Sequence, residues 1–229
     1  MMLQKKDFVE IDFTGRIKNG EVFDSTVMEE LEKLHHNHSH PIEAKPFIFC
    51  IGQGMFLESI DDFLIGKETG KIYDLELTPE KAFGNRNPDL VQMIPMKIFQ
   101  EQKINPMPGA SLNFDGRMGK ILTVSGGRVM VDFNHVLAGK TVDYKINVLR
   151  VLSDLNEKIK ALNEFFFRRD FNFKVEEKKL VIEADKQFAK VVSLFGDKFR
   201  EIIDLDLEVK EIETKGNERK NEEEAKKEQ

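Results

Sequence analysis

The side chains that could do covalent chemistry are few in this sequence. The single cysteine, Cys50, follows the apolar run Phe47-Ile48-Phe49, where no charge would stabilise a thiolate. No grouping of Ser, His and Asp, of Cys and His, or of paired carboxylates stands out. The residues alone therefore give no sign of a nucleophile or of an acid–base pair.

A dense histidine cluster is the one feature that could hold a metal. His35, His36, His38 and His40 lie in a polar stretch, and several neutral imidazole nitrogens can converge on Zn²⁺, Ni²⁺ or Cu²⁺. The cluster has no cysteine partner and no fixed-spacing motif. A solvated loop is the favoured interpretation, so we predict no metal site and no cofactor, and a metal-handling accessory role stays open as an alternative.

One acidic residue, Asp24, lies among aromatic side chains in Gly20-x-x-Phe23-Asp24-Ser25. The chain has nineteen Phe, two Tyr and no Trp, so any pocket will be apolar and poor in hydroxyl donors. Alone, Asp24 would be a turn residue that bonds nearby backbone N–H groups. Within the motif series described below, it is instead a candidate pocket charge.

Composition limits the class of protein. With 229 residues, 40% hydrophobic and 33% charged, the chain has the composition of a folded globular protein. A net charge of −6 argues against nucleic-acid binding. There is no run of about 20 apolar residues for a membrane span, no apolar stretch of signal-peptide length near Met1, and no second cysteine for an internal disulfide. We expect a cytoplasmic protein that binds neither nucleic acid nor membrane.

The elements that would position a site can be predicted from periodicity. Alternation predicts strands at 7–14, 47–51, 71–77 and 141–152, and Asn19-Gly20 predicts a hairpin turn. Apolar residues at helical spacing predict one short helix from Leu57 to Leu64. The pattern is typical of an antiparallel sheet wrapped on one short helix, an α+β fold.

The remaining segments differ from residues 7–77 in proline content and in the spacing of their apolar residues. Prolines break residues 88–136 before three short predicted strands around 112–114, 121–124 and 129–133, which indicates a small all-β module. After residue 153 the pattern predicts a helix, two strands, a second helix and a final strand, an α-β-β-α-β unit. Residues 214–229 are dense in Lys and Glu and predict a disordered tail.

Five ordered motifs resemble those of FKBP-type prolyl isomerases, in particular the SlyD-like class whose flap is interrupted by an insert-in-flap domain. The match spans about residues 7–152, and the unit at 153–213 is similar to the extra C-terminal domain of the long archaeal members. The motifs are Val9-x-Ile11-x-Phe13-Thr14-Gly15, Gly20-x-x-Phe23-Asp24-Ser25, Pro46-Phe47-x-Phe49-x-Ile51-Gly52-x-Gly54, Ala82-Phe83-Gly84 and Asn134-His135-x-Leu137-Ala138-Gly139-Lys140-Thr141.

The resemblance implies which residues form the pocket. Catalytic positions would be Asp24, Phe23, Phe83 and Tyr144. Substrate-binding positions would be Phe13, Phe47, Phe56, Leu57 and Ile60 as the floor, with Leu137 or Val136 as a looser match near the return of the insert. Phe13 and Phe83 stand where many members have Tyr, so two phenolic hydroxyls are missing.

The resemblance also implies an activity and a domain plan. We expect a peptidyl-prolyl cis-trans isomerase that acts on X-Pro bonds of unfolded or nascent polypeptides, with chaperone activity from the insert. A holdase without turnover stays open, as does a homodimer through the C-terminal domain. The predicted domains are the isomerase at 1–87 and 137–152, the insert-in-flap domain at 88–136, the C-terminal α+β domain at 153–213 and the tail at 214–229.

Overall fold

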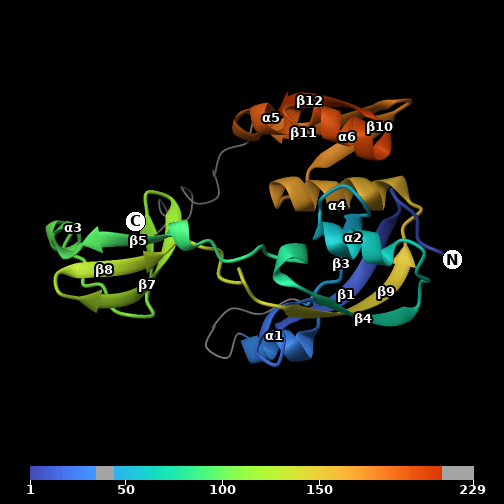
Figure 1. The fold of residues 1–229 in the computed structure, drawn as a ribbon. Coiled ribbons are helices and arrows are strands. Elements are labelled where there is room, and N and C mark those ends of the chain that lie inside the picture. The colour runs from blue at the N-terminus through green and yellow to red at the C-terminus, as the bar shows by residue number, and fades with distance from the viewer. Residues whose placement is uncertain (35–43, 213–229) are drawn as a thin grey trace, which may run out of the picture.

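The computed structural model describes residues 1–34 and 44–212, and its first layer is an antiparallel sheet of five strands (Figure 1). β1 pairs with β9 over most of its length, and β9 pairs with β4 on its other side, giving the order β2-β1-β9-β4 with β3 also on β1. The elements of this layer are β1 (Phe8–Ile17), β2 (Val22–Ser25), α1 (Met28–Leu34), β3 (Phe47–Cys50), α2 (Glu58–Leu64), β4 (Lys71–Leu77) and β9 (Val142–Val151).

The sheet and α2 enclose an apolar core, as the alternation predicted. On β1, Val9 and Ile11 are fully buried, and Ile60 and Leu64 of α2 are equally inaccessible. Cys50 is fully buried in the same core, and burial raises the pKa of its thiol to about 12. The predicted antiparallel sheet on a short helix is therefore confirmed, and Cys50 is a packing residue.

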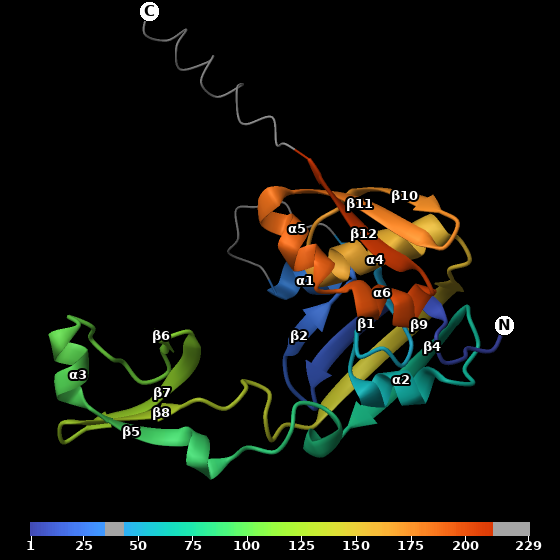
Figure 2. The same cartoon turned by 90° about the horizontal axis from the view of Figure 1, so that it is seen from above.

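Residues 91–132 form a separate four-stranded sheet that stands away from the first in both views (Figures 1 and 2). It has its own small core around Phe99, Ile121, Val129 and Val131. Its elements are β5 (Val91–Pro95), α3 (Met96–Glu101), β6 (Ser111–Phe114), β7 (Arg117–Ser125) and β8 (Arg128–Asp132), in the sheet order β5-β8-β7-β6. Strand β5 and helix α3 were not predicted, because Pro95, the N-cap of α3, was interpreted as a residue that breaks regular structure. Burial of Phe99 in the core of the second sheet stabilises α3.

The C-terminal unit packs directly on the first sheet. Its elements are α4 (Leu155–Phe167), β10 (Asn172–Glu176), β11 (Lys179–Asp185), α5 (Lys186–Ser193), α6 (Gly196–Ile203) and β12 (Asp206–Ile212), with β11 central and parallel to β12. The predicted single helix near its end is two helices, because the chain turns at Phe195-Gly196 and brings Val192 and Phe199 into the core from separate helices. Ile159 and Leu162 of α4 are fully buried in one continuous core with the first sheet.

Two sequence predictions concern residues whose structure is not described. The histidine cluster at 35–40 lies outside the described residues, and so does the tail at 214–229. Within residues 1–34 and 44–212, no three His, Cys, Asp or Glu side chains are grouped to hold a metal. In the same ranges no helix has the length and hydropathy needed to cross a membrane.

Asp61 is a buried carboxylate in α2. It is 3% exposed, and its Oδ1 has no hydrogen-bond partner among the described residues. Burial raises the pKa of Asp61 to about 6, although the backbone N–H groups of Gly52 and Gly54 donate to it and work against the shift. Because the folded protein holds this proton more tightly than the unfolded chain, the contribution of Asp61 to stability is full below pH 4 and is lost as pH rises through 6.

Asp61→Asn should remove this loss, because the amide has no proton to release and its oxygen can still accept from the two glycine N–H groups. Relative to the parent, the variant should gain about 1–3 kcal/mol in free energy of unfolding between pH 4 and pH 7. Urea titrations at both pH values measure the change. Asp74→Asn, the same substitution at an exposed position of β4, is the control. Parallel pH curves for the parent and Asp61→Asn would contradict a raised pKa at Asp61.

Candidate active site

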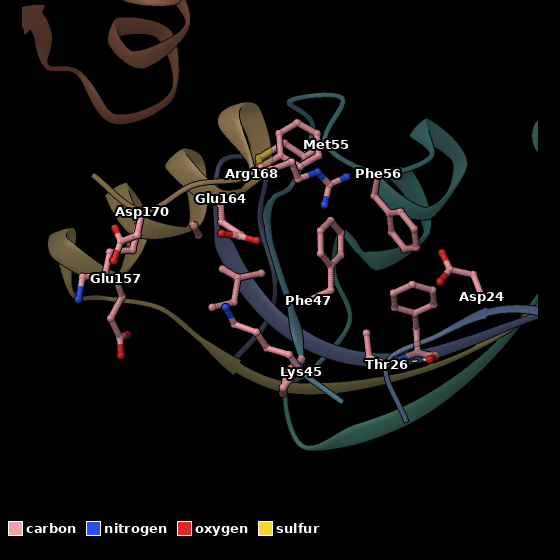
Figure 3. Close-up of a pocket in the computed structure, with 16 residues that line it drawn as sticks. Asp24, Thr26, Lys45, Phe47, Met55, Phe56, Glu157, Glu164, Arg168 and Asp170 are labelled. Atoms are coloured by element: carbon pink, nitrogen blue, oxygen red, sulfur yellow. Dashed lines mark hydrogen bonds between the residues drawn. The ribbon is translucent and has the colours of Figure 1, made fainter. Parts of the chain in front are cut away.

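A cavity of about 720 Å³ opens beside the first sheet (Figure 3). Four of the predicted site residues line it: Phe13 from β1, Asp24 from β2, Phe47 from β3 and Phe56 from the loop before α2. Phe13, Asp24 and Phe47 belong to three separate sequence motifs, and Phe56 follows the third of them. Hydrogen-bonded pairing of β2 and β3 to the same edge of β1 brings them together.

Three more predicted residues, Phe23, Phe83 and Tyr144, do not line the cavity but form one layer of rings with Phe13, Phe47 and Phe56, which do. Tyr144 of β9 is 3% exposed and lies at the centre of this layer of rings. Phe23 packs on Tyr144 and also against Phe83, which continues the layer away from the cavity. Ring centroids lie 5.0–6.2 Å apart in the pairs Phe13–Phe56, Phe47–Phe56, Phe56–Tyr144, Phe13–Tyr144, Phe23–Tyr144 and Phe23–Phe83. Edge and tilted contacts of this kind stabilise aromatic clusters beyond the area that they bury.

Gly15 is required beneath these rings. A Cβ added at Gly15 would lie 2.8 Å from Cζ of Phe23 and 3.0 Å from Cε1 of Tyr144. Only a residue without a side chain lets both rings approach the backbone of β1 this closely. The Thr14-Gly15 part of the first motif therefore has a physical role in shaping the site.

Three predicted substrate-binding residues do not line this cavity. Ile60 is fully buried and Leu57 partly buried, and both pack in the core around α2. Leu137 is 8% exposed, and its N–H donates to Nδ1 of His135 at 3.2 Å. A role for these three residues in substrate contact stays a prediction.

Asp24 is the charged residue among the predicted site residues. As a whole residue Asp24 is solvent-exposed, yet its carboxyl lines the cavity. Desolvation there raises its pKa above the ordinary value, while a backbone hydrogen bond from Ser25 works in the opposite direction. The pKa of Tyr144 is raised as well, first by burial and then by the negative charge of Asp24. The carboxylate and the phenol therefore belong to one electrostatic environment.

Sequence reasoning missed several residues around the site. Met55 and Thr26 line the cavity, and His135 stacks on Phe83 with centroids 5.0 Å apart and an interplanar angle of 7°. Met55 immediately follows the Gly52-x-Gly54 motif, so its position in the chain was a usable signal. The far wall consists of α4 and the residues after it, namely Glu157, Lys160, Ala161, Glu164, Phe165, Arg168 and Asp170. No sequence signal indicated that this helix borders the site.

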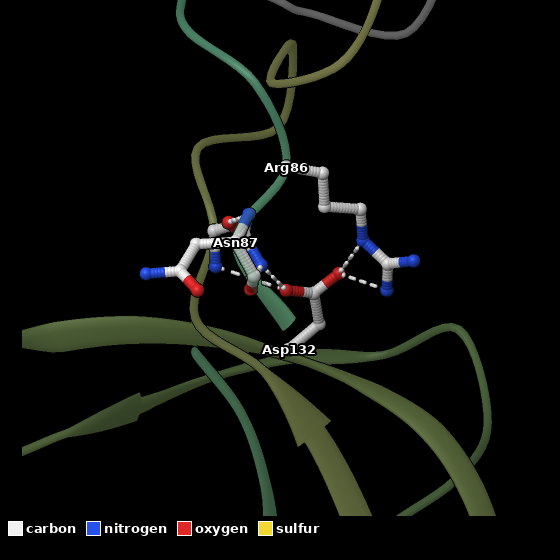
Figure 4. A network of polar contacts seen from close by, with 4 residues as sticks. Arg86, Asn87 and Asp132 are labelled. Atoms are coloured by element: carbon white, nitrogen blue, oxygen red, sulfur yellow. Dashed lines mark hydrogen bonds and ion pairs between the residues drawn. The ribbon is translucent and has the colours of Figure 1, made fainter. Parts of the chain in front are cut away.

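A polar network fixes the connection between the site and the second sheet (Figure 4). Asp132 accepts from Nε and Nη2 of Arg86 at 3.0 and 2.7 Å, and from Nδ2 of Asn134 at 2.7 Å. Asn134 in turn accepts from the N–H of Asn87 at 2.8 Å and donates to its carbonyl at 2.9 Å. Burial works against the charge of Asp132, but the bonds from Asn134 and Arg86 outweigh it and lower its pKa. These bonds hold the segment that enters the second sheet, at Arg86 and Asn87, against the segment that leaves it, at Asp132 and Asn134.

Comparisons with known proteins show which proteins this chain resembles. The family model described as "FKBP26, IF domain" matches residues 92–137. The "Short-type peptidyl-prolyl cis-trans isomerase" of Methanocaldococcus jannaschii is 32% identical over 147 residues, which are 64% of this chain and 92% of that protein. The "FKBP-type 16 kDa peptidyl-prolyl cis-trans isomerase" of Escherichia coli K12 is 35% identical over 113 residues, 47% of this chain and 75% of that protein. The "FKBP-type peptidyl-prolyl cis-trans isomerase SlyD" of Aeromonas hydrophila is 28% identical over 153 residues, 66% of this chain and 65% of that protein.

Asp132→Ala should loosen the connection, because Arg86 and Asn134 both lose their carboxylate acceptor. We expect a local loss of about 1–2 kcal/mol and trypsin cleavage after Arg86 that is several-fold faster than in the parent. Limited proteolysis followed by mass spectrometry measures the rate. Asp89→Ala makes the same charge change nearby without touching the network and should leave the rate unchanged. If all three proteins were cleaved equally fast, the network would not be what holds the two segments together.

Proposed function

The chain belongs to the FKBP-type peptidyl-prolyl cis-trans isomerases, and we propose that it accelerates isomerisation of X-Pro bonds in unfolded or nascent polypeptides. The observation that carries the proposal is the single layer of aromatic rings with Asp24 at its edge. This layer offers an apolar surface of the kind that a prolyl ring would contact. A cytoplasmic site of action is part of the proposal and is supported by the presence of only one cysteine.

The reaction itself requires no proton transfer and no covalent intermediate. An X-Pro bond has cis and trans forms of similar energy, separated by a barrier of about 18–20 kcal/mol that arises from amide resonance. The twisted transition state has lost that conjugation, so its carbonyl depends less on water than the planar amide does. A water-poor aromatic pocket therefore disfavours the planar ground state more than the transition state.

Within this mechanism the rings and Asp24 have different roles. Phe23, Phe56 and Tyr144 would hold the prolyl ring and exclude water. Asp24 would lie beside the carbonyl carbon of the preceding residue and favour the twisted amide through its charge, at a position where water screens it only in part. His135 is assigned no proton-transfer role, because it stacks on Phe83 and accepts from the N–H of Leu137.

Capture of unfolded chains is proposed for residues 88–136. In that segment Met93, Met107 and Met118 are 54–60% exposed, and methionine adapts to varied apolar partners. β5 and β6 form the edges of its sheet, where an extended chain can add hydrogen bonds. These features also suit the alternative function, a holdase in which Phe at positions 13 and 83 has removed turnover.

Self-association is a smaller part of the proposal. Val191 and Leu194 near the end of α5 are 44% and 81% exposed, and a second copy of the C-terminal unit would shield them. A measured mass in solution distinguishes monomer from dimer.

Catalytic amounts of the protein should clearly shorten cis/trans exchange in a proline tetrapeptide, which takes tens of seconds uncatalysed. Phe23→Ala should cost more in kcat/KM than Asp24→Ala, because it opens the ring layer to water whereas Asp24 supplies only a local field. NMR exchange or a protease-coupled assay measures both. A folded protein that leaves the exchange rate unchanged would leave only the holdase alternative, and the reverse ranking would make the field of Asp24 the larger effect.

Replacing residues 89–135 with a short Gly-containing flap should separate catalysis from capture. Tetrapeptide turnover should stay within a few-fold of the parent, because the ring layer lies outside the deleted segment. Acceleration of a proline-limited refolding reaction should mostly disappear, because the unfolded chain is no longer held next to the pocket. Refolding catalysis that survives the deletion intact would place capture elsewhere, and the C-terminal unit would be tested next.

A further inference from the structure

The cavity is larger than a prolyl ring requires. From its aromatic end at Phe13, Phe47 and Phe56 it continues past Lys45 to α4, within one volume of about 720 Å³ (Figure 3). Sites of 300–1,000 Å³ are typical for whole ligands of drug size. The space beyond the rings can therefore receive more of a bound chain than the proline alone.

Apart from Asp170, the far wall is a single stripe along one helix. Its residues follow the spacing i, i+3, i+4, i+7, i+8 and i+11, which places them on one face of α4 and its C-cap. At 1.5 Å per residue this face is about 17 Å long, the length of about five residues of extended peptide at 3.3 Å each. The stripe consists of Glu157, Lys160, Ala161, Glu164, Phe165 and Arg168.

This wall is fixed to the isomerase sheet. The neighbouring face of α4 buries Ile159 and Leu162 completely in the shared core. At the first turn, the guanidinium of Arg150 from β9 contacts both Glu10 of β1 and Glu157. A peptide bound along α4 would therefore meet a preorganised surface, which lowers the entropy cost of binding.

Arg168 is one of two cationic donors that this stripe leaves available; Lys160 is the other, and only Arg168 carries a planar guanidinium. It caps α4 in the left-handed conformation at φ 52°, and its backbone N–H donates to the carbonyl of Glu164. Its side chain is exposed and has no ion pair or hydrogen bond with any residue in 1–34 and 44–212. In Figure 3 the guanidinium extends from the end of α4 toward the side of the cavity where Phe47 and Phe56 lie. A planar fork of five N–H donors next to the ring layer suits oxygen acceptors on a bound chain.

We propose that about five residues flanking the substrate proline bind along α4, and that Arg168 donates hydrogen bonds to an oxygen of that segment. Arg168 is then a specificity-determining residue contributed by the C-terminal unit. The acceptor is a carboxylate or a carbonyl oxygen of the bound chain. This inference rests on the proposed isomerase function, and it adds a reason for the C-terminal unit to pack on the sheet.

The test compares a proline tetrapeptide with the same core extended by five residues on either side. The extensions carry a single Glu, Gln or Lys. In the parent, kcat/KM should be higher for an extended peptide than for the tetrapeptide, chiefly through a lower KM. Arg168→Gln should lower the ratio of extended to short kcat/KM by about tenfold, the value expected for hydrogen bonds to a charged group. If the loss is confined to Glu peptides, the acceptor is a carboxylate, and an equal loss for Glu and Gln peptides identifies a carbonyl.

Lys178→Gln is the control, because it makes the same charge change in an exposed turn of the C-terminal unit outside the cavity. It should leave the ratio unchanged, and melting temperatures verify that both variants fold. Binding of a fluorescent extended peptide is measured in parallel, so the subsite is tested even if no protein turns over the tetrapeptide. Absence of tetrapeptide turnover would overturn the proposed isomerase function but not the peptide subsite along α4. The α4 subsite is overturned if Arg168→Gln changes neither the ratio nor the affinity.

Discussion

The structure depends on one layer of aromatic rings that packs in the core of the first sheet and also lines the cavity. Tyr144 is almost fully buried, but it contacts Phe13, Phe23 and Phe56, two of which line an open cavity. The layer fits on β1 only because Gly15 has no Cβ. Any change that shifts these rings alters the packing of the first sheet and the shape of the cavity together. The site is therefore rigid because its rings are part of the close-packed core.

The same constraint governs how the other units are attached. Tyr144 lies on β9, which pairs with both β1 and β4, so the chain must return to the first sheet after the second. Phe83 and His135 stack on each other where the chain leaves and re-enters. The network of Arg86 and Asp132 fastens the two segments just beyond that point. The second sheet has a core of its own, but the segments that connect it to the first sheet are held next to the ring layer.

Much of the fold could be predicted from the sequence because its signals are local. The alternation around Ile11 predicted a strand, and Asn19-Gly20 predicted a hairpin. The pairing of β1 with β2 confirms both. Helices α1 and α3 escaped prediction because they bury too little to leave an apolar stripe in the sequence: α1 has no buried residue, and α3 buries only Phe99. The turn that separates α5 from α6 depends on packing, and Gly196 alone did not indicate it.

The site could be predicted only in part. Phe13, Asp24, Phe47 and Phe56 meet at one cavity as the resemblance implied, and strand pairing brings the first three together. The wall formed by α4 could not be foreseen, because its residues follow an ordinary solvent-facing pattern and their position depends on how Ile159 and Leu162 dock. The raised pKa of Asp61 likewise arises from burial, which the charged neighbours Asp62 and Glu58 concealed in the sequence.

The central claim is that isomerisation here proceeds through packing and desolvation by the ring layer, with no proton in transfer. The most direct test is the solvent isotope effect on kcat/KM for a proline tetrapeptide, measured in H₂O and D₂O at matched positions on the pH profile. The account predicts equal values in the two solvents, because no O–H or N–H bond breaks in the transition state. A clearly slower reaction in D₂O would contradict it and would require an acid or base that the ring layer does not supply.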